Sequence, residues 1–269
     1  MCKEKERLII VEGLPSAGKS TTARFLAAHC GMTCVDEGTG HHPADWENHA
    51  LLDEDTFRQA VSLLGDDEDA VRALCSETEY AETGYFVPIA NWLPDAVRAL
   101  LMQYKIYDVL PWAEQRAAML EKWHMFAENI GSERYVFNCV LLQNPMCETM
   151  MRFNQTLGES AAFIGEIAEI IRPLDPLVVY LQTGDIAACM QRVLPERGAE
   201  WLSAVTDYHC GSAYGKANGL HGFDGYIAAL RERQRRELAI LAALPLRSIV
   251  LSDPQNDWDA AYRTLTAQL

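Results

Sequence analysis

One stretch near the start of the chain constrains its fold more than any other. Residues 13–21 read Gly-Leu-Pro-Ser-Ala-Gly-Lys-Ser-Thr and match the pattern G-x-x-x-x-G-K-S. The aliphatic run Arg7–Val11 precedes this stretch and is typical of a buried parallel strand. Thr22–Ala28 follows it as a predicted helix, with Gly31 as the stop. A strand, a glycine-rich loop and a helix in this order predict a loop that binds phosphate.

The residue types in this loop suit a polyphosphate ligand. Glycines let the backbone turn its N–H groups inward, and the helix N-terminus adds partial positive charge. Lys19 can reach the outer phosphates, and the Ser20 hydroxyl can ligate Mg²⁺. An ordinary glycine turn with an exposed lysine is the alternative, which the flanking strand and helix disfavour. The expected nucleotide contacts are Gly13, Ser16, Ala17, Gly18, Lys19, Ser20 and Thr21.

Composition narrows the class of protein further. The chain has 269 residues, of which 49% are hydrophobic, enough for one large domain with an insertion or for two domains. A net charge of −15 argues against binding to nucleic acid polymers or anionic membranes. No apolar run approaches the ~20 residues of a membrane span, and the charged residues 1–6 do not read as a signal peptide. The eight cysteines form no CxxC pair. We therefore expect a cytoplasmic protein with reduced thiols.

Residues 32–38 predict a second short strand that ends in Asp36 and Glu37. Ligands of open α/β sheets bind beyond the carboxyl ends of the strands, so both carboxylates should lie beside the phosphate loop. There one carboxylate can accept a proton from an attacking hydroxyl, or hold the metal through water. A plain acidic turn is the alternative. The nearby His41, His42 and His49 do not show the ligand spacing of a structural zinc site.

Residues 38–133 predict a mainly helical insertion that is rich in aromatic side chains. Acidic runs at 53–55 and 66–69 are typical of helix N-termini. Tyr85, Trp92 and Tyr107 are candidates for the wall of an acceptor pocket, with ordinary core packing as the alternative.

The second half of the chain resumes the strand pattern. Residues 134–142 predict a central strand, but Asn138 and Asn144 stand where an acid commonly holds Mg²⁺. A fourth strand over 176–181 leads into a helix that carries Arg192, and Arg197 follows. Two arginines at this point can clamp phosphate bidentately, or can simply be solvated.

The remaining elements complete a sheet. Glycine-punctuated residues 201–226 predict a mobile loop, so that 192–225 forms a lid. The mixed-charge run 231–237 is predicted to be a solvated helix face rather than a binding patch. A fifth strand over 247–251 precedes a closing helix. We therefore predict a single domain over 1–269, a three-layer α/β/α fold with a five-stranded parallel sheet, in which 38–133 is a helical insertion that binds the acceptor.

This layout resembles the nucleoside and nucleotide kinases of the P-loop superfamily, in particular the thymidylate kinase and deoxynucleoside kinase branch. Val11–Thr21 is similar to their phosphate loop, including the acid before the first glycine. Val35-Asp36-Glu37, with Trp46 downstream, resembles their second-strand acid and tryptophan. Residues 177–181, followed by Arg192 and Arg197-Gly198-Ala199-Glu200, resemble their fourth strand and arginine lid. The third-strand signature of that branch, an acid followed by arginine, is absent.

The resemblance implies an ATP- and Mg²⁺-dependent kinase of a nucleoside, nucleotide or similar small acceptor. In that case Lys19, Glu37, Arg192 and Arg197 are catalytic, with Glu37 as the general base, and Ser20 and Asp36 hold the metal. The unusual third strand leaves two alternatives, a kinase of a non-nucleotide compound such as an antibiotic and a nucleotide-binding regulatory module. The sequence leaves open whether the protein forms a homodimer.

Overall fold

The computed structural model describes residues 6–38 and 40–269. They divide into two compact units, which are described separately below. The core unit comprises the residues up to Glu37 together with Ile130–Leu269, and the inserted unit comprises Gly38–Asn129. The phosphate loop lies in the core unit.

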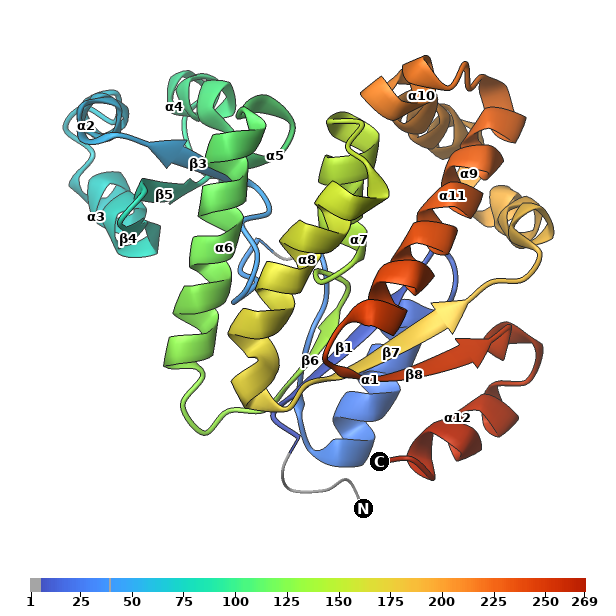
Figure 1. Cartoon of the computed structure of the whole chain (residues 1–269). Coiled ribbons are helices and arrows are strands. Elements are labelled where there is room, and N and C mark those ends of the chain that lie inside the picture. Colours follow the sequence, from blue (N-terminus) through green and yellow to red (C-terminus); the bar gives the residue numbers. More distant parts are fainter. Residues whose placement is uncertain (1–5, 39) are drawn as a thin grey trace. The chain divides into compact units, whose positions relative to one another are not determined.

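A five-stranded parallel sheet forms the centre of the core unit and confirms the predicted fold class (Figure 1). The strand order is β2-β6-β1-β7-β8. All six residues of β1 are buried, as expected of a strand covered on both faces. The strands are β1 (Leu8–Gly13), β2 (Thr33–Val35), β6 (Tyr135–Asn138), β7 (Leu177–Gln182) and β8 (Arg247–Ser252).

Helices cover both faces of this sheet. Ile9 and Val11 of β1 pack in one cluster with Leu26 of α1 (Lys19–Cys30) and Leu265 of α12 (Trp258–Thr266). On the other face, Tyr180 of β7 donates a hydrogen bond to a glutamate of α11 (Gly222–Ala243). In Figure 1, α8 (Leu157–Ile171) lies beside α11. Helix, sheet and helix therefore form the three layers that the sequence predicts.

Two parts of the core unit differ from the sequence-based expectation. β6 ends at Asn138, four residues early, because Cys139 and Val140 adopt positive φ values of 73° and 87° and turn the chain. The expected mobile loop at 201–226 is instead mostly helical, within α9 (Ile186–Gly211), α10 (Ala213–Ala217) and the start of α11. The other short helical elements are α7 (Gln143–Met146), the π-helical η2 (Cys147–Arg152), η3 (Arg172–Leu174) and η4 (Pro254–Asn256).

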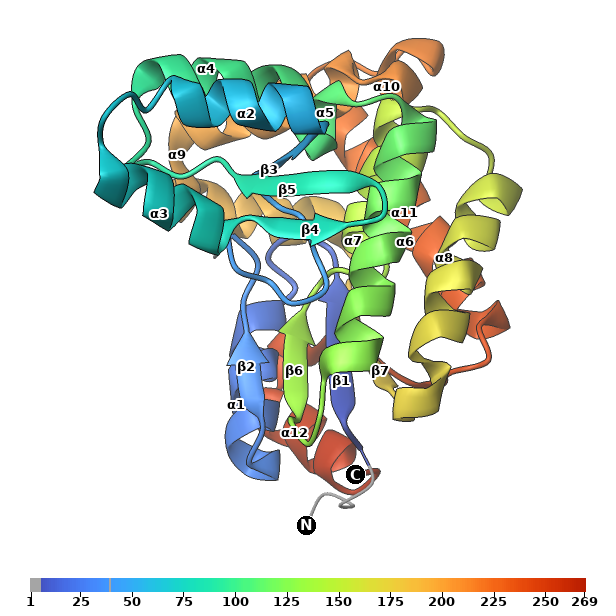
Figure 2. The same ribbon diagram turned by 90° about the vertical axis from the view of Figure 1, so that its left-hand side faces the viewer.

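The inserted unit contains strands that the sequence analysis missed. An antiparallel sheet of order β3-β5-β4 packs with the helices of this unit (Figure 2). Each strand has at most five residues, too few for a period of two to be visible. The strands are β3 (His49–Leu52), β4 (Glu79–Ala81) and β5 (Gly84–Pro88). The helices are α2 (Glu54–Ser62), α3 (Glu68–Glu77), α4 (Asp95–Leu101), η1 (Met102–Tyr104), α5 (Ile106–Val109) and α6 (Trp112–Asn129).

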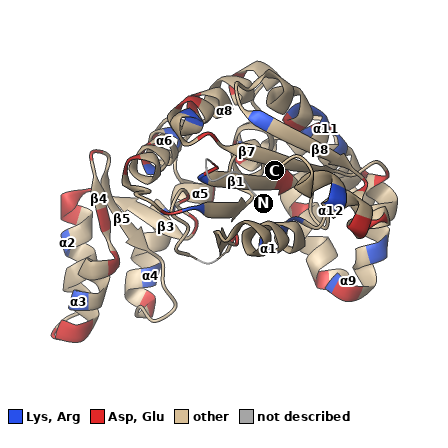
Figure 3. Ribbon diagram, turned by 90° about the horizontal axis from the view of Figure 1, so that it is seen from below, with Lys and Arg blue, Asp and Glu red and all other residues tan. Residues whose placement is uncertain are grey.

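Acidic residues start two of these helices, as predicted. Asp53 caps α2 by accepting from the backbone N–H of Thr56 at 2.8 Å, and Asp67 caps α3 through Ala70 at 3.0 Å. Figure 3 shows the acidic colouring of these two helices. Their first turns also carry Glu54, Asp55, Glu68 and Asp69, which suit the helix dipole.

The interior of the inserted unit holds a polar cluster around Trp46. This fully buried ring stacks on Phe86, with centroids 3.9 Å apart, and its indole N–H donates to the carbonyl of Ala118. The ammonium of Lys122 lies 3.9 Å from the centre of the same ring and pairs with Glu79 at 2.7 Å. Burial lowers the pKa of His49 to about 4, so this histidine is neutral at physiological pH. The downstream tryptophan of the resemblance is therefore a core side chain.

The thiols are only partly as expected. Among the residues that the structure describes, six cysteines are free, including the buried Cys139 and Cys189. Cys30 is disulfide-bonded, which contradicts the expectation for that residue. Within residues 6–38 and 40–269, no group of three or more His, Cys, Asp or Glu side chains is placed to hold a metal ion. In the same residues, no helix has both the length and the apolar character needed to span a bilayer.

Candidate active site

The phosphate loop has the geometry that its sequence predicts. It connects β1 to α1, and Gly18, the N-cap of α1, has a φ of 94°. Among the residues that the structure describes, no side chain caps this helix, so the first N–H groups of α1 can bind a ligand. The ammonium of Lys19 donates to the carbonyl of Leu14 within the loop at 3.1 Å, and the side chain is buried. The side chain of Lys19 is therefore folded back over the backbone of its own loop.

Gly13 is needed for the close approach of two strands. Its φ is 147°, and a Cβ at this position would lie 2.7 Å from the carbonyl oxygen of Leu181 on β7. Gly13→Ala should therefore cost about 2 kcal/mol of unfolding free energy, measured by urea denaturation. Gly165→Ala is the matched control, because its helical position has open space and should gain up to ~1 kcal/mol. Equal stability of the two variants would contradict the geometry.

A cavity of about 550 Å³ opens beside the loop within the core unit. One side consists of phosphate-loop residues, among them Ser16, Gly18, Lys19, Ser20 and Thr21. The other sides come from Glu37 after β2, from the α7–η2 segment, and from α9 and α11. The residues from these later segments are Gln143, Cys147, Val193, Glu196, Arg197, Trp201, Val205, His209 and Arg233. Distant parts of the chain therefore meet around the loop.

The metal candidates Ser20 and Asp36 lie close together. The amide nitrogen of Asn138 donates to the Ser20 hydroxyl at 3.0 Å and to Asp36 at 3.2 Å, so both oxygens contact one nitrogen. Asp36 also pairs with Arg24 at 2.6 Å. Asn138 thus occupies the place of the expected third-strand acid and connects the two oxygen ligands. Ser20 lines the cavity, whereas Asp36 is not among the residues that line it.

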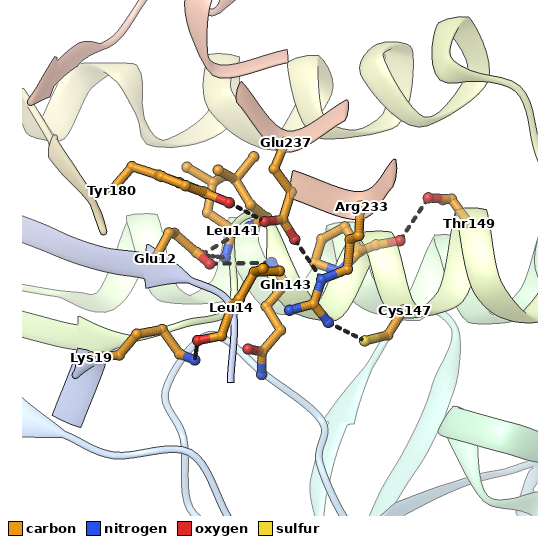
Figure 4. A network of polar contacts seen from close by, with 12 residues as sticks. Glu12, Leu14, Lys19, Leu141, Gln143, Cys147, Thr149, Tyr180, Arg233 and Glu237 are labelled. Carbon is orange, nitrogen blue, oxygen red and sulfur yellow. Dashed lines mark hydrogen bonds and ion pairs between the residues drawn. The ribbon is translucent and has the colours of Figure 1, made fainter. Parts of the chain in front are cut away.

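Glu37, the expected base, lines the cavity and is held by a partner that the sequence analysis did not identify. The Gln143 amide donates to its carboxylate at 2.8 Å. Gln143 is in turn positioned by Glu12, whose carboxylate accepts the backbone N–H groups of Leu141, Leu142 and Gln143 at 2.8 to 3.2 Å (Figure 4). Burial raises the pKa of Glu12 to about 7. The acid before the first glycine therefore fixes the loop that orients the candidate base.

The two candidate arginines differ in position. Arg197 lines the cavity together with Lys19, and its guanidinium lies 5.6 Å from the ring centre of Trp201. Arg192 is exposed on α9 and does not line the cavity. The structure therefore places Arg197, but not Arg192, in the wall of this cavity.

The sequence analysis missed a third arginine. Arg233 belongs to the run predicted to be a solvated face, yet its side chain is only 2% exposed and lines the cavity. Its Nε lies 3.1 Å from Glu237, and Nη1 donates to the Cys147 sulfur at 3.6 Å. Burial is the largest single effect and opposes the charge, but Glu237, Cys147, Tyr180 and Cys139 together outweigh burial and raise the pKa of the guanidinium. The sequence did contain a signal for a buried Arg233, namely its spacing from other residues of α11. Tyr226, Leu230, Arg233 and Glu237 are three or four positions apart and form one buried stripe along this helix.

His209 on α9 is the other functional candidate that the sequence analysis missed. Its ring is buried, lines the cavity, and contacts the Val205 carbonyl through Nδ1 at 2.7 Å. Burial, with a contribution from Arg233, lowers its pKa to about 4. A neutral histidine therefore lies in a wall that was expected to be a mobile loop.

The comparisons with known proteins concern the fold. No protein-family model and no curated protein match the sequence. Among solved structures, the chain is similar to the YorR protein of Bacillus subtilis in complex with phosphorylated GDP, at 13% identity and a TM-score of 0.46, over 97% of this chain and 94% of that one.

Two further similar structures have kinase names. Deoxyadenosine kinase from M. mycoides with bound dATP matches at 13% identity and a TM-score of 0.43, over 96% of this chain and 99% of that one. An unliganded sugar kinase from a Janibacter species matches at 14% identity and a TM-score of 0.37, over 97% of this chain and 93% of that one. All three TM-scores are below 0.5, so no conclusion about activity follows from them. The phosphate loop, the uncapped helix and the parallel sheet themselves make the core unit a P-loop α/β fold.

Proposed function

We propose that the protein is an ATP-dependent phosphotransferase whose acceptor is a small molecule of the nucleoside or nucleotide kind. The observation that supports this most is the single cavity shared by Lys19, Ser20, Glu37 and Arg197. It combines a phosphate-loop cation, a metal-binding hydroxyl, a carboxylate and a second cation. Phosphoryl transfer depends mainly on positioning and charge neutralisation, which these four groups can supply.

In this proposal the loop amides and Lys19 bind the β- and γ-phosphates of ATP. Arg197 neutralises charge on the transferred group, and Glu37 orients or deprotonates the acceptor hydroxyl. Arg192 lies outside the cavity, so its proposed role is limited to the rim of the nucleotide site.

The residues present fit Mg²⁺. Ser20 and Asp36 would hold this ion through oxygen atoms, which are the ligands that it prefers. The Asn138 amide now directs its nitrogen toward both oxygens, while its own oxygen accepts only a weak bond from the Cys139 thiol at 3.6 Å. Rotation of this amide would break these two bonds and would present its oxygen on the side of Ser20 and Asp36. Bound Mg²⁺ would neutralise charge between the β- and γ-phosphates.

The test is transfer of labelled phosphate from ATP, with Mg²⁺, to a panel of nucleosides, nucleoside monophosphates and non-nucleotide alcohols. Glu37→Gln should lower the transfer rate about a hundredfold while ATP binding stays unchanged, because the amide cannot accept the acceptor proton. Glu169→Gln, which alters an exposed glutamate on α8 outside the cavity, is the control.

A nucleotide-binding module with little turnover is the second candidate, and Asn138 favours it because it replaces an acid. Equal slow turnover in the unaltered protein and in Glu37→Gln, with intact ATP binding, would support this candidate. Transfer to an alcohol such as an antibiotic, but to no nucleoside or nucleotide, would keep the kinase and change its acceptor.

A further inference from the structure

Among the described residues, three buried polar atoms on side chains that line the cavity have neither a hydrogen-bond partner nor an ion-pair partner. Nη2 of Arg233, Nε2 of His209 and Oε1 of Gln143 make no hydrogen bond with any residue in 6–38 or 40–269. All three side chains line the same cavity. Buried polar atoms in native proteins are nearly always paired, so three unpaired atoms at one cavity call for a ligand.

The donor or acceptor character of each atom is fixed by its neighbour. The Glu37 carboxylate only accepts, so the Gln143 nitrogen must face Glu37, and its oxygen, an acceptor, is left unpaired. The Val205 carbonyl also only accepts, so the proton of neutral His209 lies on Nδ1, and Nε2 is a bare acceptor. A guanidinium only donates, so Nη2 of Arg233 offers N–H groups. The site therefore presents two acceptors and one donor.

This polarity selects the ligand. A phosphate or carboxylate offers only acceptors and would face the lone pairs of Gln143 and His209. A hydroxyl group both donates and accepts, so two or more hydroxyls on one molecule can satisfy all three atoms. Arg233 adds no free positive charge for an anion, because Glu237 already neutralises it at 3.1 Å. Figure 4 shows its guanidinium between Glu237 and Cys147, with the remaining nitrogen turned toward the side of Gln143 and Lys19.

We propose that Gln143, His209 and Arg233 bind the hydroxyl groups of an uncharged, hydroxyl-rich molecule, such as a sugar or the sugar of a nucleoside. The binding of this molecule is independent of the proposed function. Its role as the phosphoryl acceptor rests on that function. Gln143 also contacts Glu37, so the same side chain connects the bound hydroxyls to the candidate base. The site lies wholly in the core unit, and not in the inserted unit where the acceptor was expected.

The experiment is calorimetric titration in the presence of Mg²⁺ and a non-hydrolysable ATP analogue. The probes are ribonucleosides, pentoses, hexoses and inositol, each compared with its own monophosphate ester. We expect at least one uncharged compound to bind about tenfold or more tightly than its ester. His209→Phe and Gln143→Met should each weaken that compound about tenfold, the effect of one lost hydrogen bond, and leave the affinity for the ATP analogue within about twofold.

The matched controls are His221→Phe and Gln191→Met, both exposed and outside the cavity, which should change neither affinity. Arg233 is not substituted, because its loss would leave the buried carboxylate of Glu237 without its ion-pair partner. Tighter binding of the esters, or no response to His209→Phe and Gln143→Met, or no binding by any uncharged probe, would each overturn the proposal. Binding with the expected variant effects but without phosphate transfer would uphold this site and refute the kinase.

Discussion

Lys19→Met should lower the rate of phosphate transfer about a thousandfold and weaken ATP binding, measured by single-turnover kinetics and calorimetry. One preorganised donor at a developing charge contributes on the order of 10² to 10³ in rate, and a cation at phosphate contributes at the upper end. Methionine keeps the apolar stem of this buried side chain, and the hydrogen bond that is lost is the one to the Leu14 carbonyl. The variant should therefore fold normally, and the lower transfer rate and weaker ATP binding can be attributed to the missing ammonium group.

Lys216→Met on α10 is the control for this result, because Lys216 is exposed and lies outside the cavity. It should keep the full rate. Normal ATP binding by Lys19→Met would contradict the assignment of residues 13–21 as a phosphate loop. Lost binding in a variant with an unchanged unfolding transition would support that assignment for a kinase and for a regulatory module alike.

Glu12→Ala should lower the unfolding free energy by about 4 kcal/mol, measured by urea denaturation at pH 8. The carboxylate satisfies three buried backbone N–H groups, and each unsatisfied group costs about 1–3 kcal/mol. These bonds also hold Cys139 and Val140 at their positive φ values, which are unfavourable for residues with a side chain. Glu128→Ala, an exposed position on α6, should change stability by less than about 0.5 kcal/mol.

The pH dependence of stability gives an independent test of Glu12. Its pKa rises from 4.5 in the unfolded chain to about 7 in the fold, chiefly through burial. Between these values the folded protein keeps a proton that the unfolded chain releases, so this group's contribution falls as pH rises from 4.5 to 7. The fall amounts to about 3 kcal/mol. The side chain of Glu12→Gln cannot titrate, so this variant should not show the fall in stability between pH 4.5 and 7. Equal pH profiles of stability for the variant and the unaltered protein would contradict a buried Glu12 carboxyl with a raised pKa.

Local patterns predicted the core unit well. The β-branched runs of β1 and β7 and the glycine stop of α1 at Gly31 depend on neighbours within a few residues, which a single sequence shows. The turn after Asn138 was not predictable in this way. Cys139 and Val140 favour a strand, and the carboxylate of Glu12, far away in sequence, binds the N–H groups that directly follow their left-handed turn.

The candidate site was predictable to the same extent. Lys19 and Ser20 belong to a motif, and Glu37 follows from a strand end. Gln143 and His209 reach the cavity only through tertiary packing, and Arg233 reads as solvated because charged residues surround it in sequence. The three strands of the inserted unit were missed for a related reason, since pairing rather than propensity stabilises such short segments.

Helix α9 is broken once, at Gly198, where φ is 83° and ψ is 170°. Arg197 lies on one side of this break and His209 on the other, and both line the cavity. Two ligands that engage these side chains at once would fix the angle between the two halves of the helix. The first ligand to bind would then bear the entropic cost of that restraint, and the second would bind more tightly. Thermodynamic reciprocity makes this mutual enhancement equal in both orders of addition.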